Sequence, residues 1–236
     1  MDPARIAALL EPFLSAKLSP SCRSERASAR EKPDVLSPAQ LRGISIYIDL
    51  ILRWNARINL TAIRDPEEIV TRHFGESFFV ARILFPAFSA NSAVKGVHVA
   101  DVGSGAGFPG LPINLWAPHV SLTLIESNHK KAAFLREAAR ALTLTNVNVL
   151  TSRAEELLNQ SSGSPASFDI VTLRAVERFE AILPIASSLL APQGRLVLLI
   201  GSAQVKPALA ALPSLSWDNP VPVPLSRSRV VAVAQR

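Results

Sequence analysis

Three glycines at alternating positions are the residues of this chain best suited to bring a ligand against the main chain. They belong to the stretch Val97–Gly110, which reads VHVADVGSGAGFPG. Its apolar part predicts a strand that ends at Asp101, and Gly103, Gly105 and Gly107 predict a tight turn. Glycine adopts backbone conformations that a Cβ forbids, and it lets a ligand approach closely. The stretch therefore predicts a ligand site after a strand, with an ordinary strand-to-helix loop as the alternative.

The spacing of these glycines indicates which ligand the turn would hold. In a dinucleotide fingerprint the third glycine comes three residues after the second, and that position is Phe108 in this chain. A dehydrogenase is therefore the least favoured function. The pattern Gly-x-Gly-x-Gly, after a strand that ends in an acid, instead suggests a site for S-adenosylmethionine (AdoMet).

A second acid stands at the end of the next apolar segment. Val120–Glu126 reads VSLTLIE and predicts a buried strand that ends at Glu126. In nucleotide-binding α/β sites, a carboxylate at this position accepts hydrogen bonds from ribose hydroxyls. The alternative is a solvated glutamate before the helix that we expect from Asn128, and the position and acid type favour the ribose role.

The segments after Val97 alternate between apolar runs of strand length and helical patterns, the clearest helix being Asn128–Leu142. This alternation predicts an α/β fold, a doubly wound, mostly parallel sheet with helices on both faces. Val230–Ala234 could close the sheet as an antiparallel strand, while five prolines after Lys206 exclude regular helix over much of that segment. The predicted strands are Val97–Asp101, Val120–Glu126, Val147–Thr151, Phe168–Arg174 and Arg195–Ile200.

In a doubly wound sheet the ligand lies across the carboxyl ends of the strands. The third predicted strand is followed by Ala154 and Glu155, which could frame an adenine ring. The fourth ends at Arg174, where a methyl acceptor would approach. Arg174 could equally be a structural arginine paired with an acid such as Glu155, and the residues leave both roles open.

We expect residues 1–90 to form an N-terminal helical region and residues 91–236 the α/β domain. Residues 18–36 are rich in Ser, Arg, Pro and charge, which predicts a flexible surface loop. Ser37 and Asp65 predict the starts of two helices, the second with Arg72 and His73 near its end. We interpret His73 as structural rather than catalytic, because no Ser or Cys motif accompanies it.

Composition limits the classes of function and location. Among the 236 residues, 25 Lys and Arg against 19 Asp and Glu give a net charge of +6, which supports a polyanionic partner weakly. Cys22 is the one cysteine, so the chain can form no intrachain disulfide or cysteine-based metal site, and we expect no metal. No run of eighteen apolar residues and no convincing signal peptide is present. We therefore expect a cytoplasmic, monomeric protein with no membrane partner.

Four segments together resemble a known family. WNARINLTAIRDPEEIVTRHFGES, VADVGSGAGFPGLPINLWAP, TSRAEEL and FDIVTLRAV occur in this order between Leu36 and Gly201. They are similar to the glucose-inhibited division protein B family, small-subunit ribosomal RNA methyltransferases that act on guanine N7. The resemblance implies a seven-stranded, Rossmann-like class I methyltransferase fold with an N-terminal helical extension. It also implies AdoMet as cofactor and small-subunit (16S) ribosomal RNA, or the ribosomal subunit, as partner.

The resemblance also assigns residues to the cofactor. It implies AdoMet contacts for Gly103, Phe108, Ala154, Glu155 and Arg174, and the wider class I pattern adds Asp101, Gly105, Gly107 and Glu126.

Two positions depart from the family pattern. Glu76 stands where the family usually has Asp, which is a tolerable change. Ile200 precedes Gly201 where the family typically has Lys, so this strand end lacks the lysine that could contact a phosphate.

Residue types also bear on the chemistry. Guanine N7 carries a lone pair and no proton, so its methylation needs proximity and orientation rather than a base. The fourth strand is followed by Arg174, Ala175 and Val176 instead of the Asn or Asp and two prolines of amine methylation. Alternatives are a class I methyltransferase acting on a small molecule or protein, and a non-catalytic nucleotide-binding regulatory protein.

Overall fold

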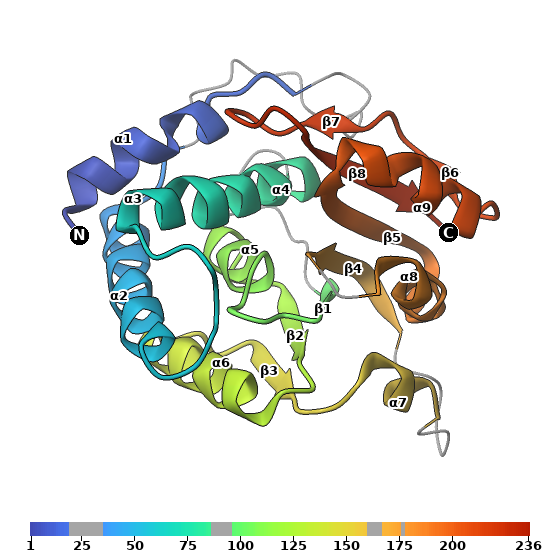
Figure 1. Cartoon of the computed structure of the whole chain (residues 1–236), viewed down its shortest axis with the longest axis horizontal. Helices are drawn as coiled ribbons and strands as arrows, with labels where there is room; N and C mark the ends of the chain where they lie inside the picture. Colours follow the sequence, from blue (N-terminus) through green and yellow to red (C-terminus); the bar gives the residue numbers. More distant parts are fainter. Residues whose placement is uncertain (19–34, 86–95, 160–166, 176–177) are drawn as a thin grey trace.

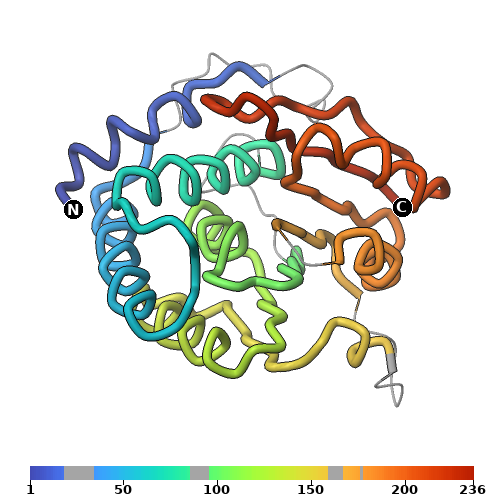
Figure 2. Tube along the Cα trace, viewed as in Figure 1, coloured from blue at the N-terminus to red at the C-terminus, as the bar shows by residue number. Residues whose placement is uncertain are grey.

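The computed structural model describes residues 1–18, 35–85, 96–159, 167–175 and 178–236. Within these residues the chain forms one mixed β-sheet with helices on both faces (Figure 1). The N- and C-termini lie on opposite sides of this view (Figure 2). The flexible loop expected at residues 18–36, including Cys22, lies outside the described residues except at its ends.

The sheet has eight strands in the order β3-β2-β1-β4-β5-β8-β6, and β7 also pairs with β8. The first five strands in the chain are mutually parallel, and β8 is antiparallel to β5. The bounds are β1 (His98–Val102), β2 (Ser121–Ile125), β3 (Val147–Leu150), β4 (Phe168–Arg174), β5 (Leu190–Gly201), β6 (Ser216–Trp217), β7 (Val221–Pro222) and β8 (Arg229–Gln235).

The predicted parallel sheet is confirmed, and each of its five strands lies where an apolar run predicted it. The prediction of an antiparallel strand over Val230–Ala234 is also confirmed, as β8. Seven strands were expected, and the strand order has seven positions. The eighth strand is present because two short strands, β6 and β7, both pair with β8.

Two apolar cores cover the two faces of the sheet. Val99 of β1 packs into one core and Ala100 into the other, as the alternation of side chains along a strand requires. The first core holds buried side chains of α1 (Pro3–Leu14), α2 (Pro38–Asn55), α4 (Glu76–Leu84), α5 (Gly110–Trp116) and α6 (His129–Ala141). The second holds those of α7 (Ala154–Asn159), α8 (Phe179–Ser188) and α9 (Val205–Ala211).

Capping residues begin the helices where the sequence predicts. The side-chain oxygen of Ser37 accepts a hydrogen bond from the backbone N–H of Gln40, the Gln40 side-chain oxygen accepts one from the backbone N–H of Ser37, and α2 follows. Asp65 caps α3 (Pro66–Glu68), and Asn128 caps α6. These caps fix the starts of helices that pack beside the turn after β1.

One expectation about helices is wrong, and one short helix was not expected. The helix that begins at Pro66 does not end near His73, because the π-helical segment η2 (Ile69–Gly75) joins α3 to α4 in one helical run. The proline-rich end of the chain also contains α9, in which Pro207 is the third residue. Proline is tolerated there because the first turn of a helix needs no N–H donor from within the helix.

No helix in the described part of the chain is long and apolar enough to cross a membrane. Among the same residues, no group of three or more His, Cys, Asp or Glu side chains is arranged to hold a metal ion.

Candidate active site

A buried acid, Asp101, stabilises the glycine turn after β1. Gly103, Gly105 and Gly107 all have positive φ angles, of 70°, 56° and 84°, which confirms the predicted turn. Asp101 is 1% exposed, and its carboxylate accepts hydrogen bonds from Thr172 Oγ1 at 2.7 Å and from the Gly110 N–H at 3.3 Å. Burial raises the pKa of Asp101 to about 6. Asp101 therefore anchors the turn to its neighbours and lines no part of the cleft described next.

Glu126 follows β2 and lies against the same turn. Its Oε2 accepts a hydrogen bond from the Gly105 N–H at 2.8 Å, and its Oε1 accepts one from the Asn128 N–H at 2.8 Å. The residue is 7% exposed, so the alternative of a freely solvated glutamate is wrong. The two backbone bonds orient the carboxylate and leave each oxygen a second lone pair for a ligand.

A cleft runs along the carboxyl ends of the parallel strands, in two halves of about 530 Å³ each. Gly103, Glu126 and Ser127 line both halves, so the halves adjoin at the glycine turn. We call them the β2–β3 half and the β1–β4 half. The glycine turn and Glu126 thus lie at the centre of a site large enough for a nucleoside.

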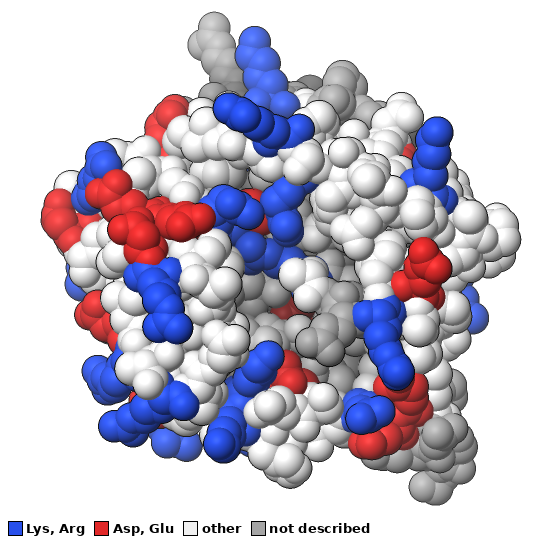
Figure 3. All heavy atoms as spheres, viewed as in Figure 1, with Lys and Arg blue, Asp and Glu red and all other residues white. Residues whose placement is uncertain are grey.

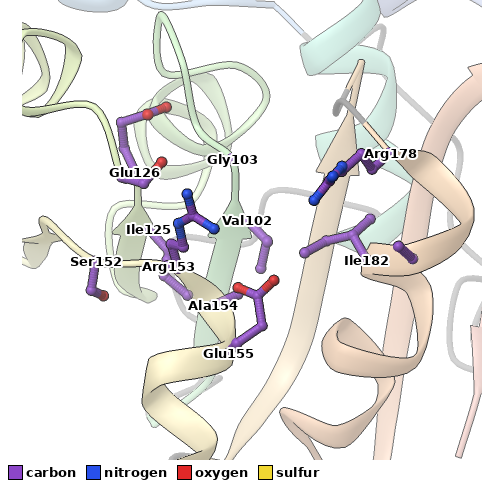
Figure 4. Close-up of a pocket in the computed structure, with 12 residues that line it drawn as sticks. Val102, Gly103, Ile125, Glu126, Ser152, Arg153, Ala154, Glu155, Arg178 and Ile182 are labelled. Carbon is purple, nitrogen blue, oxygen red and sulfur yellow. The ribbon is translucent and has the colours of Figure 1, made fainter.

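The β2–β3 half is formed by the residues after β2 and β3 and by the start of α8. Arg153 and Glu155 point into it from one wall, and Arg178 and Ile182 from the opposite wall (Figure 4). Ser152 Oγ, also in this half, is buried and has no hydrogen-bond partner among the described residues. An unpaired buried hydroxyl is costly, which points to a polar ligand at this place.

The β1–β4 half is lined by the turn, by Lys131 and by a wall of His73, Phe108 and Arg174. Phe108 stacks on His73 with ring centroids 4.8 Å apart, and on Tyr47 of α2 with centroids 5.4 Å apart. The Tyr47 hydroxyl donates a hydrogen bond to the Ala106 carbonyl oxygen at 2.5 Å. Helix α2 therefore holds both the turn and the aromatic wall in place.

His73 is a neutral ring with both nitrogens engaged. Arg174 Nη2 can only donate, so Nδ1 of His73 accepts that hydrogen bond, at 3.0 Å. The remaining ring proton then lies on Nε2, which donates to Thr61 Oγ1 at 2.8 Å. Burial, with the nearby charge of Arg174, lowers the pKa of His73 to about 3. The structural interpretation of His73 agrees with this geometry.

Arg174 forms an ion pair with Glu76 of α4, and not with Glu155, which the sequence offered as a partner. Its Nη2 donates to Glu76 Oε2 at 3.2 Å and to the Arg72 carbonyl oxygen at 2.7 Å. Glu76 is 1% exposed and also forms ion pairs with Arg72 at 3.3 Å and with Arg229 of β8 at 3.0 Å. Burial lowers the pKa of Arg174 to about 10, so it stays charged at neutral pH. Arg174 therefore pairs with a buried acid, as the structural role requires, and it also lines the cleft, where the acceptor role stays a prediction.

The cleft brings together most of the residues that the sequence singled out. Those that line it are Gly103, Gly105, Phe108, Glu126, Ala154, Glu155 and Arg174. Asp101 and Gly107 do not line the cleft. Thr61 and Ser152 also line the cleft. Both lie in segments that carry the family resemblance, although the sequence assigned neither of them an individual role. Arg178 was not predicted, because no motif marks the start of α8 from which it reaches the cleft.

Known proteins match this chain over most of its length. A family model described as "GidB: rRNA small subunit methyltransferase G" matches residues 40–218. The chain is 38% identical over 221 residues to Ribosomal RNA small subunit methyltransferase G of Xanthomonas axonopodis pv. citri, with 92% of each chain covered. The chain belongs to the GidB family. A Stenotrophomonas maltophilia protein of the same name is 39% identical over 191 residues, covering 81% of this GidB-family chain and 80% of that protein.

Solved structures support the fold of this GidB-family chain. Ribosomal protein L11 methylase from Lactobacillus delbrueckii subsp. bulgaricus superposes with a TM-score of 0.52 at 17% identity, covering 69% of this chain and 79% of that one. Pyrococcus horikoshii TYW2, solved in complex with MeSAdo, gives a TM-score of 0.50 at 13% identity, over 69% of this chain and 61% of that one. At these identities the likeness concerns the fold alone.

The face that carries the cleft of this GidB-family chain is rich in positive charge. Lys and Arg side chains gather around a hollow in the middle of this face (Figure 3). The described lining of the two halves contains four cationic residues, Lys131, Arg153, Arg174 and Arg178, against the two acids Glu126 and Glu155.

Proposed function

We propose that this chain transfers the methyl group of AdoMet to N7 of a guanine in small-subunit (16S) ribosomal RNA. The observation that carries the proposal is the place of Glu126, in the wall common to both halves of the cleft, with both oxygens oriented by backbone N–H groups. The family supplies the class of substrate, because relatives that match 92% of the chain are named small-subunit ribosomal RNA methyltransferases.

The described residues fit AdoMet. Glu126 would accept hydrogen bonds from the ribose hydroxyls, and Ser152 Oγ, which lacks a partner, would gain one from the adenine in the β2–β3 half. A Cβ at Gly105 would enter open space, with its nearest neighbour, Gly103 O, 3.8 Å away. That open space is where the methionine part would approach the turn, opposite Phe108 and Arg174.

The residues of the cleft suit chemistry that needs no proton removal. When bound, AdoMet supplies an electrophilic methyl group on its sulfonium centre. Guanine N7 offers a lone pair and carries no proton, so no side chain has to act as a general base. His73 agrees with this, because it is neutral and both its nitrogens are occupied. The chain would contribute orientation and exclusion of water.

The charge around the cleft suits an RNA partner. Cations that neutralise phosphates release counterions, and this supplies affinity for any stretch of backbone. The net charge of +6 and the basic rim of the cleft both support a ribosomal subunit or its RNA as substrate. A substrate of this kind would place the activity in the cytoplasm, and we infer that the chain acts as a monomer.

Methyl transfer from labelled AdoMet tests the proposal. The substrates are small ribosomal subunits that lack the modification and, in a second arm, their naked RNA. We expect label in RNA, and cleavage of the chain at the labelled nucleotide after borohydride and aniline treatment, which reports 7-methylguanine. Glu126→Gln should lose most of this transfer, while Glu137→Gln, at a glutamate of α6 that lines neither half of the cleft, should retain it.

Three results would contradict the proposal. Label on an exocyclic amine would refute the choice of N7. Label in a small molecule or a ribosomal protein, with none in RNA, would refute the RNA substrate. AdoMet binding in a calorimetric titration with no transfer to any of these would favour a non-catalytic protein.

A further inference from the structure

A smaller cavity lies over the carboxyl ends of β4 and β5, next to the cleft. It has a volume of about 160 Å³ and is lined by Leu173, Phe179, Leu199 and Ile200, with Gln204 and Arg229 as its polar residues. We call it the tip cavity. Ala175 lines both the tip cavity and the β1–β4 half of the cleft, so a group held in one adjoins a group held in the other.

The lining of the tip cavity suits a flat ring better than a phosphate. Leu173, Leu199 and Ile200 are 1–3% exposed, so their walls are apolar and fixed in the core. Phe179, half-buried at the start of α8, adds an aromatic side chain. A nucleobase has apolar faces that stack on aromatic rings and a polar edge that accepts hydrogen bonds. A phosphate needs donors on several sides, and apolar residues form most of this cavity.

Arg229 stands at the polar end with donors to spare. Its Nη2 donates to the Leu199 carbonyl oxygen at 3.3 Å, and its Nε lies 3.0 Å from Glu76 Oε2. Its Nη1 has no hydrogen-bond partner among the described residues. The side chain is 20% exposed, so a ligand in the tip cavity can reach it.

We propose that the tip cavity receives the acceptor guanine, with its face against Phe179 and its O6 accepting a hydrogen bond from Arg229. This inference rests on the proposed function and names the base site for it. Guanine presents an acceptor at O6, whereas adenine presents an N–H donor at the same place, so Arg229 selects guanine. Methylation leaves a positive charge on the purine, and the ion pair with Glu76 offsets the charge of Arg229 that would oppose it.

The experiment removes O6 and Arg229 separately and together. Small subunits lacking the modification are reconstituted with guanine or 2-aminopurine at the target position. The latter retains N7 and the exocyclic amine but has no O6. The full chain, Arg229→Met and the control Arg227→Met, an exposed arginine of the same segment, are compared by kcat/KM for methyl transfer. The AdoMet Kd and the thermal midpoint of each variant are measured alongside.

Loss of O6 should lower kcat/KM by about tenfold or more for the wild type and for Arg227→Met, since one base-reading arginine discriminates at this level. For Arg229→Met, guanine and 2-aminopurine should differ by about twofold or less. The AdoMet Kd should not change, because Arg229 lies outside the cofactor cleft. If loss of O6 lowers kcat/KM equally for the wild type and for Arg229→Met, the proposal is overturned and Arg229 has a phosphate-binding or structural role.

A second variant keeps the proposal falsifiable if Arg229→Met fails to fold. Phe179→Leu preserves the apolar wall but removes the ring, and it should raise KM for the subunit about fivefold or more, with the AdoMet Kd unchanged. An unchanged KM would overturn the proposal. If the wild-type chain transfers no label to guanine-containing subunits, the proposed function itself fails, which is a different result from equal losses in an active enzyme.

Discussion

The glycines of the turn have different tasks although they share a motif. Gly105 faces the open cleft, and a Cβ there would meet nothing closer than 3.8 Å. Gly107 faces the core, and a Cβ there would collide with the Tyr47 hydroxyl and lie 2.6 Å from Leu111 Cδ1. One glycine therefore leaves room for a ligand, and the other leaves room for α2 and α5.

Alanine substitutions separate these tasks. Gly105→Ala should weaken AdoMet binding about tenfold or more in a calorimetric titration, with a loss of about 1 kcal/mol in unfolding free energy from the positive φ. Gly107→Ala should lose a further ~1–3 kcal/mol, because its methyl group overpacks the core. Equal loss of stability in the two variants, with no difference in AdoMet affinity, would contradict this division.

Asp101 makes stability depend on pH in a direction unusual for an aspartate. Its folded pKa is about 6 against an ordinary value of 3.8, because burial disfavours the charged form. Between these values the folded state binds more protons than the unfolded state, so its contribution to unfolding free energy falls as pH rises. The total fall is about 3 kcal/mol, at about 1.4 kcal/mol per pKa unit.

Asp101→Asn tests this, because an amide can still accept from Gly110 and donate to Thr172 Oγ1. Urea denaturation of both proteins should show the stability of the wild type falling relative to the variant between pH 4 and pH 6. The difference should be constant above pH 7. A difference that is flat from pH 4 to pH 8, or that changes in the opposite direction, would show that Asp101 ionises normally.

At the scale of elements, α2 fixes the wall of the cleft although it lies about fifty residues before the turn. Tyr47 is fully buried, stacks on Phe108 and donates to the Ala106 carbonyl oxygen. Helix α2 therefore supports the wall of the cleft as well as the core.

Tyr47→Phe should show this coupling. The ring and its stacking remain, but the Ala106 carbonyl loses its donor in a buried place, which costs about 1–3 kcal/mol of unfolding free energy. The turn should then hold AdoMet less tightly, and calorimetry should give a Kd several-fold higher. The matched control Tyr47→Leu removes the ring too and should be worse on both measures. An unchanged Kd in Tyr47→Phe would show that α2 does not position the turn.

Local sequence patterns predicted those strands and helix starts that depend on residues close together in the sequence. The strands from β1 to β4 and the caps at Ser37, Asp65 and Asn128 follow from apolar runs and capping residues. The passage of the helix through His73 could not be predicted, because η2 is stabilised by tertiary contacts rather than by its own residue types. The helix that contains Pro207 was missed because its proline happens to fall in the first turn.

At the scale of the whole molecule, the fold brings charged residues from distant parts of the sequence into one cluster, which no local sequence pattern predicts. Glu76 of α4, Arg174 of β4 and Arg229 of β8 meet although about fifty to a hundred and fifty residues separate them in sequence. The sequence predicted that Arg174 lies at a strand end, but it could not select Glu76 over Glu155 as partner. Ile200, where the family typically has Lys, is buried, and Arg229 brings a cation to this strand end from β8.

We infer that the glycine turn and Glu126 hold AdoMet across the ends of β1 and β2. A crystal structure of the chain with AdoMet tests it most directly. We expect the ribose hydroxyls within hydrogen-bond distance of the Glu126 carboxylate and the adenine beside Ser152 and Ala154. A ligand bound elsewhere, for example in the groove where α2 meets Leu115 and Leu142, with the cleft beside Glu126 empty, would contradict it.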